Sequence, residues 1–175
     1  FQEKPAIEEA RGNSINTGIY VFNYKIFDYI PENTFFDFAK NVFPTLLKNN
    51  IKINTFPVNE YWSDIGTINQ YFESTKDLFD GKCTIDETNI LESKNGQYIS
   101  CSQISAPNNL IGFNTIGSNC SIGKNSTLEN CIIWNNVTIK DNISLKNCII
   151  ASGNIIEKSF ENTIIGEDFL LLNKA

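Results

Sequence analysis

Histidine and methionine are absent from the 175 residues, and arginine occurs once, at Arg11. The lack of histidine excludes Ser-His-Asp and Cys-His nucleophilic sites, zinc sites of the HExxH type and any histidine general base. Any chemistry must therefore rest on carboxylates, lysines, amides and a bound metal ion. The lack of methionine means that Phe1 is not a translation start, so we expect these residues to be a piece of a longer protein.

Basic residues are also few: 14 lysines and arginines stand against 20 aspartates and glutamates, for a net charge of −6. A nucleic-acid-binding protein presents a basic face, so we expect no nucleic-acid partner. No apolar run approaches the ~18 residues that a membrane span needs, so we expect no membrane partner either. With 41% hydrophobic and 19% charged residues, the composition is typical of a folded globular protein.

Five cysteines are present, an odd number, and no Cys-x-x-Cys pair occurs. Their density is far below that of a disulfide-stabilised scaffold. We therefore expect reduced thiols that pack as small apolar groups, in a cytoplasmic protein. The five are Cys83, Cys101, Cys120, Cys131 and Cys148.

The first half of the chain alternates strand-like and helix-like patterns. Residues Ile15–Phe22 and Ile51–Val58 are rich in β-branched and aromatic side chains, which predicts two strands. Apolar residues at helical spacing predict helices over 35–47 and 67–79. Such alternation is typical of an α/β domain, and we assign residues 1–82 to the C-terminal part of one.

Residues that start and stop helices support this assignment. Thr34 is the predicted N-cap of the first helix, and Pro44 should break or kink it into two short helices. Gly81 is a natural stop for the second helix. We expect the apolar side of that second helix to pack on the α/β core.

The second half repeats itself every 17 residues. Within each unit the aliphatic residues lie five or six positions apart, which predicts a solenoid with three short faces per coil. We assign the solenoid to residues 101–175, after a linker over 83–100. The residues that this step aligns are Ile111 with Leu128 and Leu145, Ile116 with Ile133 and Ile150, Ile122 with Ile139 and Ile156, and Cys131 with Cys148.

Asparagine occupies the expected turns between faces, because it tolerates the left-handed backbone that sharp corners require. We predict that four asparagines are corner residues, neither ligands nor glycosylation sites: Asn119, Asn125, Asn136 and Asn142. The open end of a solenoid needs cover. The apolar segment Phe169–Leu172 is a candidate cap for the last coil or a subunit contact.

This repeat resembles the left-handed parallel β-helix of hexapeptide-repeat proteins, over residues Leu110–Phe169. Acyltransferases and nucleotidyltransferases both carry that fold. The acyltransferases of this fold use a histidine general base, which the chain cannot supply. The resemblance therefore favours a nucleotidyltransferase.

Three motifs in the first half resemble those of the nucleotide-sugar pyrophosphorylases. They are Phe1–Pro5 (FQEKP), Asn16–Tyr20 (NTGIY) and Tyr61–Thr67 (YWSDIGT), in the family's order. These enzymes join a nucleoside triphosphate to a sugar 1-phosphate and release pyrophosphate, and the resemblance is strongest to mannose-1-phosphate guanylyltransferases. It spans nearly the whole chain and implies the C-terminal part of a Rossmann-like α/β domain followed by a left-handed parallel β-helix.

The resemblance also implies roles for individual residues. Lys4 would be the catalytic lysine that contacts the phosphate of the sugar 1-phosphate, and Glu3 would accept hydrogen bonds from sugar hydroxyls. Asn16, Thr17 and Gly18 would bind the sugar: the amide would bond a hydroxyl, and the glycine would let the backbone approach the ring.

Asp64 is implied to be one carboxylate ligand of the Mg²⁺ cofactor, which prefers oxygen ligands and substrate phosphates. The family's glycine-rich nucleotide-binding loop and its first metal-binding aspartate are absent from these residues. We therefore expect no transferase activity from the 175 residues alone.

The sugar and the base stay open, because the motifs are shared by the whole class. Mannose 1-phosphate with GTP is the main expectation, and glucose 1-phosphate with dTTP, UTP or CTP is the alternative. A non-catalytic regulatory or assembly subunit would also keep this architecture. In every case we expect a homo-oligomer.

Overall fold

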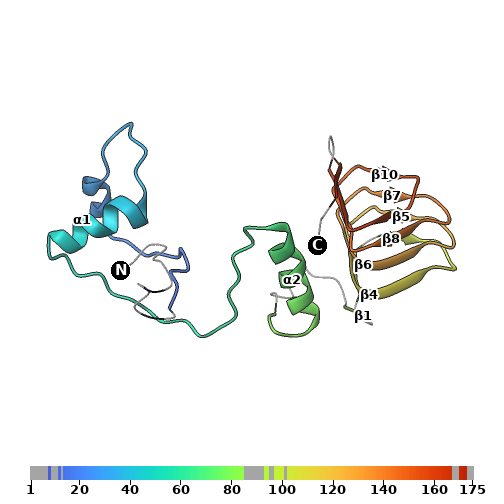
Figure 1. Cartoon of the computed structure of the whole chain (residues 1–175), viewed down its shortest axis with the longest axis horizontal. Helices are drawn as coiled ribbons and strands as arrows, with labels where there is room; N and C mark the ends of the chain where they lie inside the picture. Colours follow the sequence, from blue (N-terminus) through green and yellow to red (C-terminus); the bar gives the residue numbers. More distant parts are fainter. Residues whose placement is uncertain are drawn as a thin grey trace. The chain divides into compact units, whose positions relative to one another are not determined.

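A computed structural model describes residues 8, 12, 14–84, 93–94, 97–100, 102–166 and 170–172 (Figure 1). Its contacts divide the chain into two compact units, Phe1–Asp64 and Ile65–Ala175. Each unit has its own hydrophobic core.

Short helices dominate the first unit. They are the 3₁₀-helix η2 (Tyr24–Tyr29), the π-helix η3 (Phe38–Val42) and the α-helix α1 (Phe43–Lys48). Their apolar sides gather into a small core, whose buried members are Ile26, Val42, Phe43 and Leu46.

The helix expected over 35–47 forms, but it begins later than the sequence suggested. Thr34 does not cap it: its hydroxyl donates to a backbone carbonyl two residues earlier, at 3.2 Å, and the residue lies three positions before the observed cap. Asp37 is the N-cap instead, and its Oδ1 accepts from the backbone N–H of Lys40 at 2.8 Å. The break expected at Pro44 is confirmed as the change from η3 to α1, since proline has no N–H for the preceding turn.

The two strands expected at Ile15–Phe22 and Ile51–Val58 do not form, so that expectation is wrong for this structure. A strand needs a neighbouring strand to satisfy its backbone N–H and C=O groups. No strand lies among the described residues of the first unit, so neither segment finds a partner there. Both run as irregular backbone despite their strand-like side chains.

The second unit begins with α2 (Ile68–Phe79), the second helix that the sequence predicted. Thr67 caps it by accepting from the backbone N–H of Gln70 at 3.1 Å. Gly81 follows its end with φ of +72°, which confirms the expected glycine stop. Within the described part of the chain, no helix has both the length and the apolar character that crossing a membrane requires.

A parallel β-helix of about four turns follows α2, consistent with a left-handed one (Figure 1). One sheet runs in the order β1-β2-β4-β6-β9-β12-β13, with β8 joining β6 to β11, and a second runs β10-β7-β5-β3. Strands of successive coils pair in parallel, which confirms the solenoid. The strands are β1 (Ser93–Lys94), β2 (Gln97–Ile99), β3 (Gln103–Ile104), β4 (Asn109–Ile116), β5 (Ser121–Ile122), β6 (Thr127–Ile133), β7 (Thr138–Ile139), β8 (Ser144–Lys146), β9 (Ile149–Ile150), β10 (Ile155–Ile156), β11 (Phe160–Glu161), β12 (Thr163–Ile165) and β13 (Leu170–Leu172).

Columns of inward side chains fill the β-helix, as the repeat predicted. Ile116, Ile133 and Ile150 stack in register on three successive coils. Each of them is at most 2% exposed. Full burial of one aliphatic side chain is worth about 1.5–3 kcal/mol, so these columns supply the main stabilisation of the unit.

One predicted alignment is wrong by a residue: Leu110, not Ile111, lies beside Leu128. Four positions separate Leu110 from Asn114, but three separate Leu128 from Cys131, because β4 carries a bulge. A one-residue shift turns a strand side chain to the opposite face. Ile111 therefore points outward and is 43% exposed.

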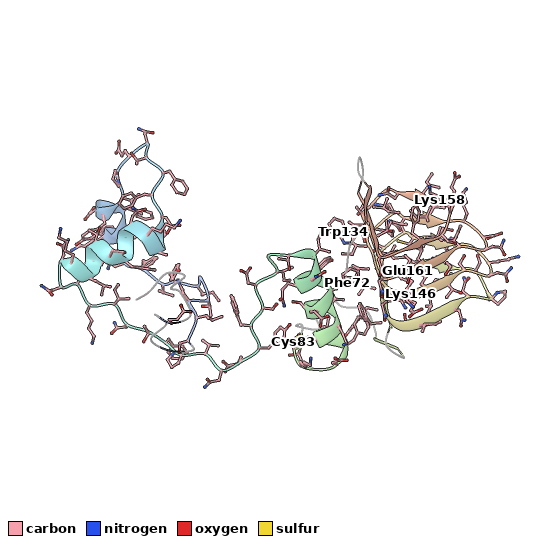
Figure 2. The ribbon with its side chains drawn as sticks, viewed as in Figure 1. Phe72, Cys83, Trp134, Lys146, Lys158 and Glu161 are labelled. Carbon is pink, nitrogen blue, oxygen red and sulfur yellow. The ribbon has the colours of Figure 1, made fainter. Side chains whose placement is uncertain are left out.

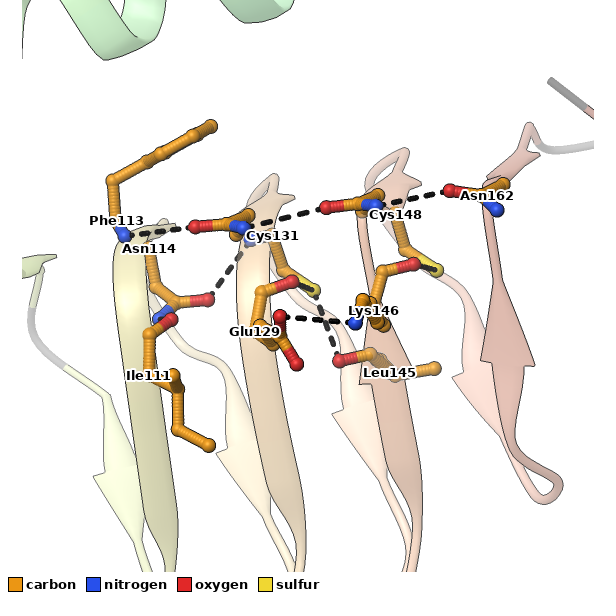
Figure 3. Close-up of polar contacts among 11 residues, drawn as sticks. Ile111, Phe113, Asn114, Glu129, Cys131, Leu145, Lys146, Cys148 and Asn162 are labelled. Carbon is orange, nitrogen blue, oxygen red and sulfur yellow. Dashed lines mark hydrogen bonds and ion pairs between the residues drawn. The ribbon is translucent and has the colours of Figure 1, made fainter. Parts of the chain in front are cut away.

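Asparagines at the corners have the left-handed backbone that the sequence predicted. Their φ angles lie between 57° and 62° at Asn119, Asn125, Asn136 and Asn142. A further column joins neighbouring coils through side-chain amides (Figure 3). In it Asn130 donates to Asn147 at 3.4 Å, and Asn147 donates to Asn162 at 3.0 Å.

Glycine is required where a corner of one coil lies against the next coil. A Cβ on Gly123 would lie 2.4 Å from Oδ1 and 2.5 Å from the backbone nitrogen of Asp141. That carboxylate oxygen accepts from the backbone N–H of Lys124 at 2.7 Å, which holds the two coils together. Gly117 has the same relation to Asn135.

Replacing Gly123 with alanine should lower the free energy of unfolding by about 3 kcal/mol, because the backbone of the next coil must move. Gly153→Ala is the matched control, since a Cβ there meets no heavy atom within 4 Å although φ is +80°. Its cost should be about 1 kcal/mol, from the left-handed backbone alone. Urea unfolding measures both, and equal losses would rule out the close contact between coils as the cause.

Helix α2 packs on the β-helix and not on an α/β core, contrary to the sequence-based expectation (Figure 2). Tyr71 and Phe72 lie against a column of isoleucines that face outward from β6, β9 and β12: Ile132, Ile149 and Ile164. These isoleucines are buried because α2 covers them. One outer face of the β-helix is therefore apolar, and α2 packs against that face.

The last coil is closed by an antiparallel strand. β13 pairs with β12, with Leu170 opposite Ile165. The cap expected within Phe169–Leu172 is confirmed for its last three residues, while Phe169 lies outside the described residues. A role of this segment as a subunit contact stays a prediction.

The described cysteines are free, as expected: Cys120, Cys131 and Cys148 are buried and Cys83 is half-buried. Cys101 lies outside the described residues. A hydrogen bond with the Cys148 thiol, together with burial, raises the pKa of Cys131. A thiol that stays protonated is unreactive.

Thiol labelling should therefore separate the cysteines. In a Cys101→Ser variant, the folded chain should react with a thiol reagent at Cys83, and the buried thiols should react only after unfolding. The absorbance of the released chromophore counts the reactive groups. Rapid reaction of more than one thiol in the folded protein would contradict the burial of the β-helix cysteines.

Candidate functional site

The turn Asn16–Gly18 lies in the first unit and is held by its own asparagine. Oδ1 of Asn16 accepts from the backbone N–H of Gly18 at 3.1 Å, and Nδ2 donates to the hydroxyl of Tyr20 at 2.6 Å. Gly18 has φ of +76°, a conformation that residues with a side chain rarely adopt. Thr17, between them, is half-buried. The structure thus places the three predicted sugar-binding residues in one ordered turn.

Tyr20 connects this turn to the core of the first unit. The centroid of its ring lies 5.4 Å from that of Phe22, 6.0 Å from that of Phe38 and 5.2 Å from that of Phe43. These ring contacts fix the hydroxyl and, through it, the amide of Asn16. No role was predicted for Tyr20, although its place at the end of the same motif was an available signal.

Asp64 lies in an exposed segment that leads to Thr67, the N-cap of α2. No described contact joins it to the Asn16–Gly18 turn. Groups of three histidine, cysteine, aspartate or glutamate side chains able to hold a metal ion are also absent from the described residues. Glu3 and Lys4, the other predicted site residues, lie outside the described residues.

A single exposed carboxylate fits Mg²⁺ as one ligand of several. Magnesium in phosphate chemistry is usually held by one or two carboxylates, and substrate phosphates and water complete its octahedron. Among the described residues, Asp64 has no ion-pair partner that would compete for its oxygens. It can therefore serve as a ligand when a substrate brings phosphates, but it does not form a metal site by itself.

Large apolar side chains stand exposed on the first unit. Val21 is 98% exposed, Phe35 92% and Phe56 89%. A soluble domain scatters such residues singly and buries most of them. These three side chains bury almost none of their apolar surface within the described part of the chain.

Two family models match the chain. Residues 1–81 match the family described as Nucleotidyl transferase. Residues 82–171 match the family described as GlmU-like, C-terminal hexapeptide. The first match includes all three motifs of the sequence analysis, and the second includes the β-helix.

Curated relatives agree with these families. A glucose-1-phosphate adenylyltransferase of Clostridium novyi (strain NT) is 32% identical over 133 residues, 70% of this chain and 33% of the relative. A glucose-1-phosphate adenylyltransferase of Acetivibrio thermocellus is 28% identical over 182 residues, 96% of this chain and 38% of the relative. A UTP–glucose-1-phosphate uridylyltransferase of Synechocystis is 27% identical over 154 residues, 77% of this chain and 40% of the relative. The chain thus spans about a third to two-fifths of the length of these relatives.

The names of these relatives bear on the expected substrates. All three are named for glucose 1-phosphate, so mannose 1-phosphate with GTP is not supported and the glucose alternative is closer. That alternative included UTP but not the adenylyl donor that two of the three names carry. The motifs of the first unit are common to the whole class and could not make this distinction.

Proposed function

We propose that the chain, which belongs to the GlmU-like hexapeptide family through residues 82–171 and matches the Nucleotidyl transferase family over residues 1–81, forms part of a glucose-1-phosphate adenylyltransferase. In that reaction a phosphate oxygen of glucose 1-phosphate attacks the α-phosphate of ATP. A new P–O bond forms, and the bond to the β-phosphate breaks to release pyrophosphate. The match of residues 1–81 to the Nucleotidyl transferase family supports the reaction class, and the names of the Clostridium novyi and Acetivibrio thermocellus relatives support glucose 1-phosphate and the adenylyl donor. UTP is the second candidate donor, on the likeness to the Synechocystis relative.

We further propose that this chain supplies the sugar-phosphate side of the site, and that the remainder of a longer protein supplies the nucleotide side. The chain covers only 33% to 40% of the relatives described above. The exposed side chains of Val21, Phe35 and Phe56 would be covered by that remainder, and Ile15–Phe22 would gain the partner strand that it lacks. Pyrophosphate release by the purified 175 residues alone would contradict this division.

Nucleotidyl transfer depends on positioning and charge neutralisation more than on covalent participation of the protein. Lys4 would neutralise the sugar phosphate, and Glu3 would accept from a sugar hydroxyl. Asn16, whose amide Tyr20 already orients, would bond a second hydroxyl. Asp64 would hold Mg²⁺, which when bound neutralises charge on the nucleotide phosphates.

The role of the Asn16 turn is tested by Asn16→Ala in the full-length enzyme. The change should raise KM for glucose 1-phosphate about tenfold, the loss of one good hydrogen bond, and leave KM for ATP within about twofold. Steady-state kinetics with each substrate varied in turn give both values.

Asn54→Ala is the matched control, because Asn54 is exposed in the same unit and lies outside the three motifs. It should leave both KM values unchanged. An equal rise of both values in Asn16→Ala would show that the turn acts on the fold as a whole and not on the sugar.

A further inference from the structure

An open hollow of about 350 Å³ lies between α2 and the β-helix, within the second unit. It crosses residues of β2, β4 and β6, and Tyr71 of α2 forms one of its walls. Its volume falls in the range of small-molecule sites, roughly 300–1,000 Å³. None of the residues proposed for nucleotidyl transfer lines it.

Trp134 is the residue of this hollow that coil packing does not explain (Figure 2). The 17-residue repeat places it in a column with Gly117 and Ala151. Both neighbours are small and can cover little of an indole ring. Its Nε1 donates to the hydroxyl of Tyr71 at 3.3 Å, yet the side chain is still 46% exposed. An indole that is held at its N–H and left half exposed offers ring surface to a ligand.

The walls combine aromatic rings with neutral polar groups. The aromatic residues are Tyr71, Tyr98 and Trp134. The polar side chains are those of Thr115, Asn135 and Ser152. No charged residue is among those that line the hollow, all of which the structure describes.

This combination selects the chemistry of a ligand. A phosphate or carboxylate would need a cation or a converging set of N–H donors. Neither lysine nor arginine lines the hollow to provide them. A purely apolar ligand would cover the hydroxyls of Thr115 and Ser152 without pairing them. A saccharide ring has apolar C–H faces that lie on aromatic rings and hydroxyls that pair with neutral donors and acceptors.

We propose that the hollow binds an uncharged saccharide, on residues of α2 and the β-helix alone. The site shares no residue with the Asn16 turn, and neither lysine nor arginine lines it. Its occupancy does not depend on the nucleotidyl transfer proposed above, so the two proposals can fail separately.

The fluorescence of Trp134 can report binding directly, because Trp62 is the only other tryptophan of the chain. In a Trp62→Phe variant of the 175 residues, glucose and maltose should each shift the Trp134 emission, saturating at about 1–10 mM. Ser152→Leu places a bulkier side chain at the wall and should weaken the apparent affinity at least about tenfold. Ser144→Leu makes the same change at an exposed serine of β8 and should leave the affinity within about twofold.

Tyr71→Phe is a second wall variant, which keeps the aromatic ring and removes one hydroxyl. It should weaken binding about threefold. Circular dichroism and the melting temperature establish that each variant is folded. No emission change up to about 50 mM saccharide overturns the proposal, as does a change that both wall variants leave intact. A response to glucose 1-phosphate with none to the neutral sugars overturns it too, because binding would then rest on the phosphate.

Discussion

Asp64→Asn in the full-length enzyme should lower kcat at least about a hundredfold, or about 2.7 kcal/mol of transition-state stabilisation. The asparagine keeps the size of the side chain but removes the charge that makes a carboxylate a good Mg²⁺ ligand. Folding should be unaffected, since Asp64 is exposed and no ion pair involves it among the described residues. The Mg²⁺ concentration for half-maximal rate should also rise.

Glu60→Gln is the control for Asp64→Asn, because it removes the same charge from the same exposed segment. Its kcat should stay within about twofold of the parent enzyme. An Asp64→Asn enzyme with full activity and unchanged Mg²⁺ dependence would refute the metal-ligand role.

Ile156→Ala should lower the free energy of unfolding by about 3 kcal/mol, whereas Ile155→Ala should cost less than about 0.5 kcal/mol. The two residues are adjacent in β10, where Ile156 pairs with Ile139 of β7 and Ile155 pairs with Thr138. Ile156 is 2% exposed and Ile155 is 63% exposed. Only Ile156→Ala removes methyl groups from a filled column of the interior and leaves a cavity.

Chemical unfolding of the two isoleucine variants measures this difference with the same substitution in the same strand. The pair is sensitive to register, because a shift by one residue exchanges the inner and outer faces of a strand. Equal losses, or a larger loss at Ile155, would show that the coil is registered differently from the structure described here.

The β-helix could be predicted from the sequence because each coil finds its partner 17 residues away in the same chain. The period fixed which side chains point inward, and the corner asparagines followed from the backbone they must adopt. The bulge in β4 could not be predicted, since Leu110 and Ile111 are adjacent and equally suited to the interior. The folded structure shows that Leu110 packs against the core and is partly buried, whereas Ile111 is exposed.

The first unit was less predictable because its strands depend on partners beyond their own segments. Ile15–Phe22 has the side chains of a strand, but nothing in the described unit offers it a backbone to pair with. The helix start was predicted at Thr34 but lies at Asp37, because the sequence offers two good capping residues three positions apart. The contact from Tyr20 to Asn16 depends on the ring packing of the folded unit and has no signature in spacing alone.

The central claim is that this chain contributes the sugar-phosphate side of a glucose-1-phosphate adenylyltransferase. Pyrophosphate release by the full-length protein tests it most directly, with glucose 1-phosphate or mannose 1-phosphate paired with ATP, UTP or GTP in the presence of Mg²⁺. We predict turnover with glucose 1-phosphate and ATP. A folded full-length protein that is silent with every pair would contradict the claim and favour a non-catalytic subunit of the same architecture.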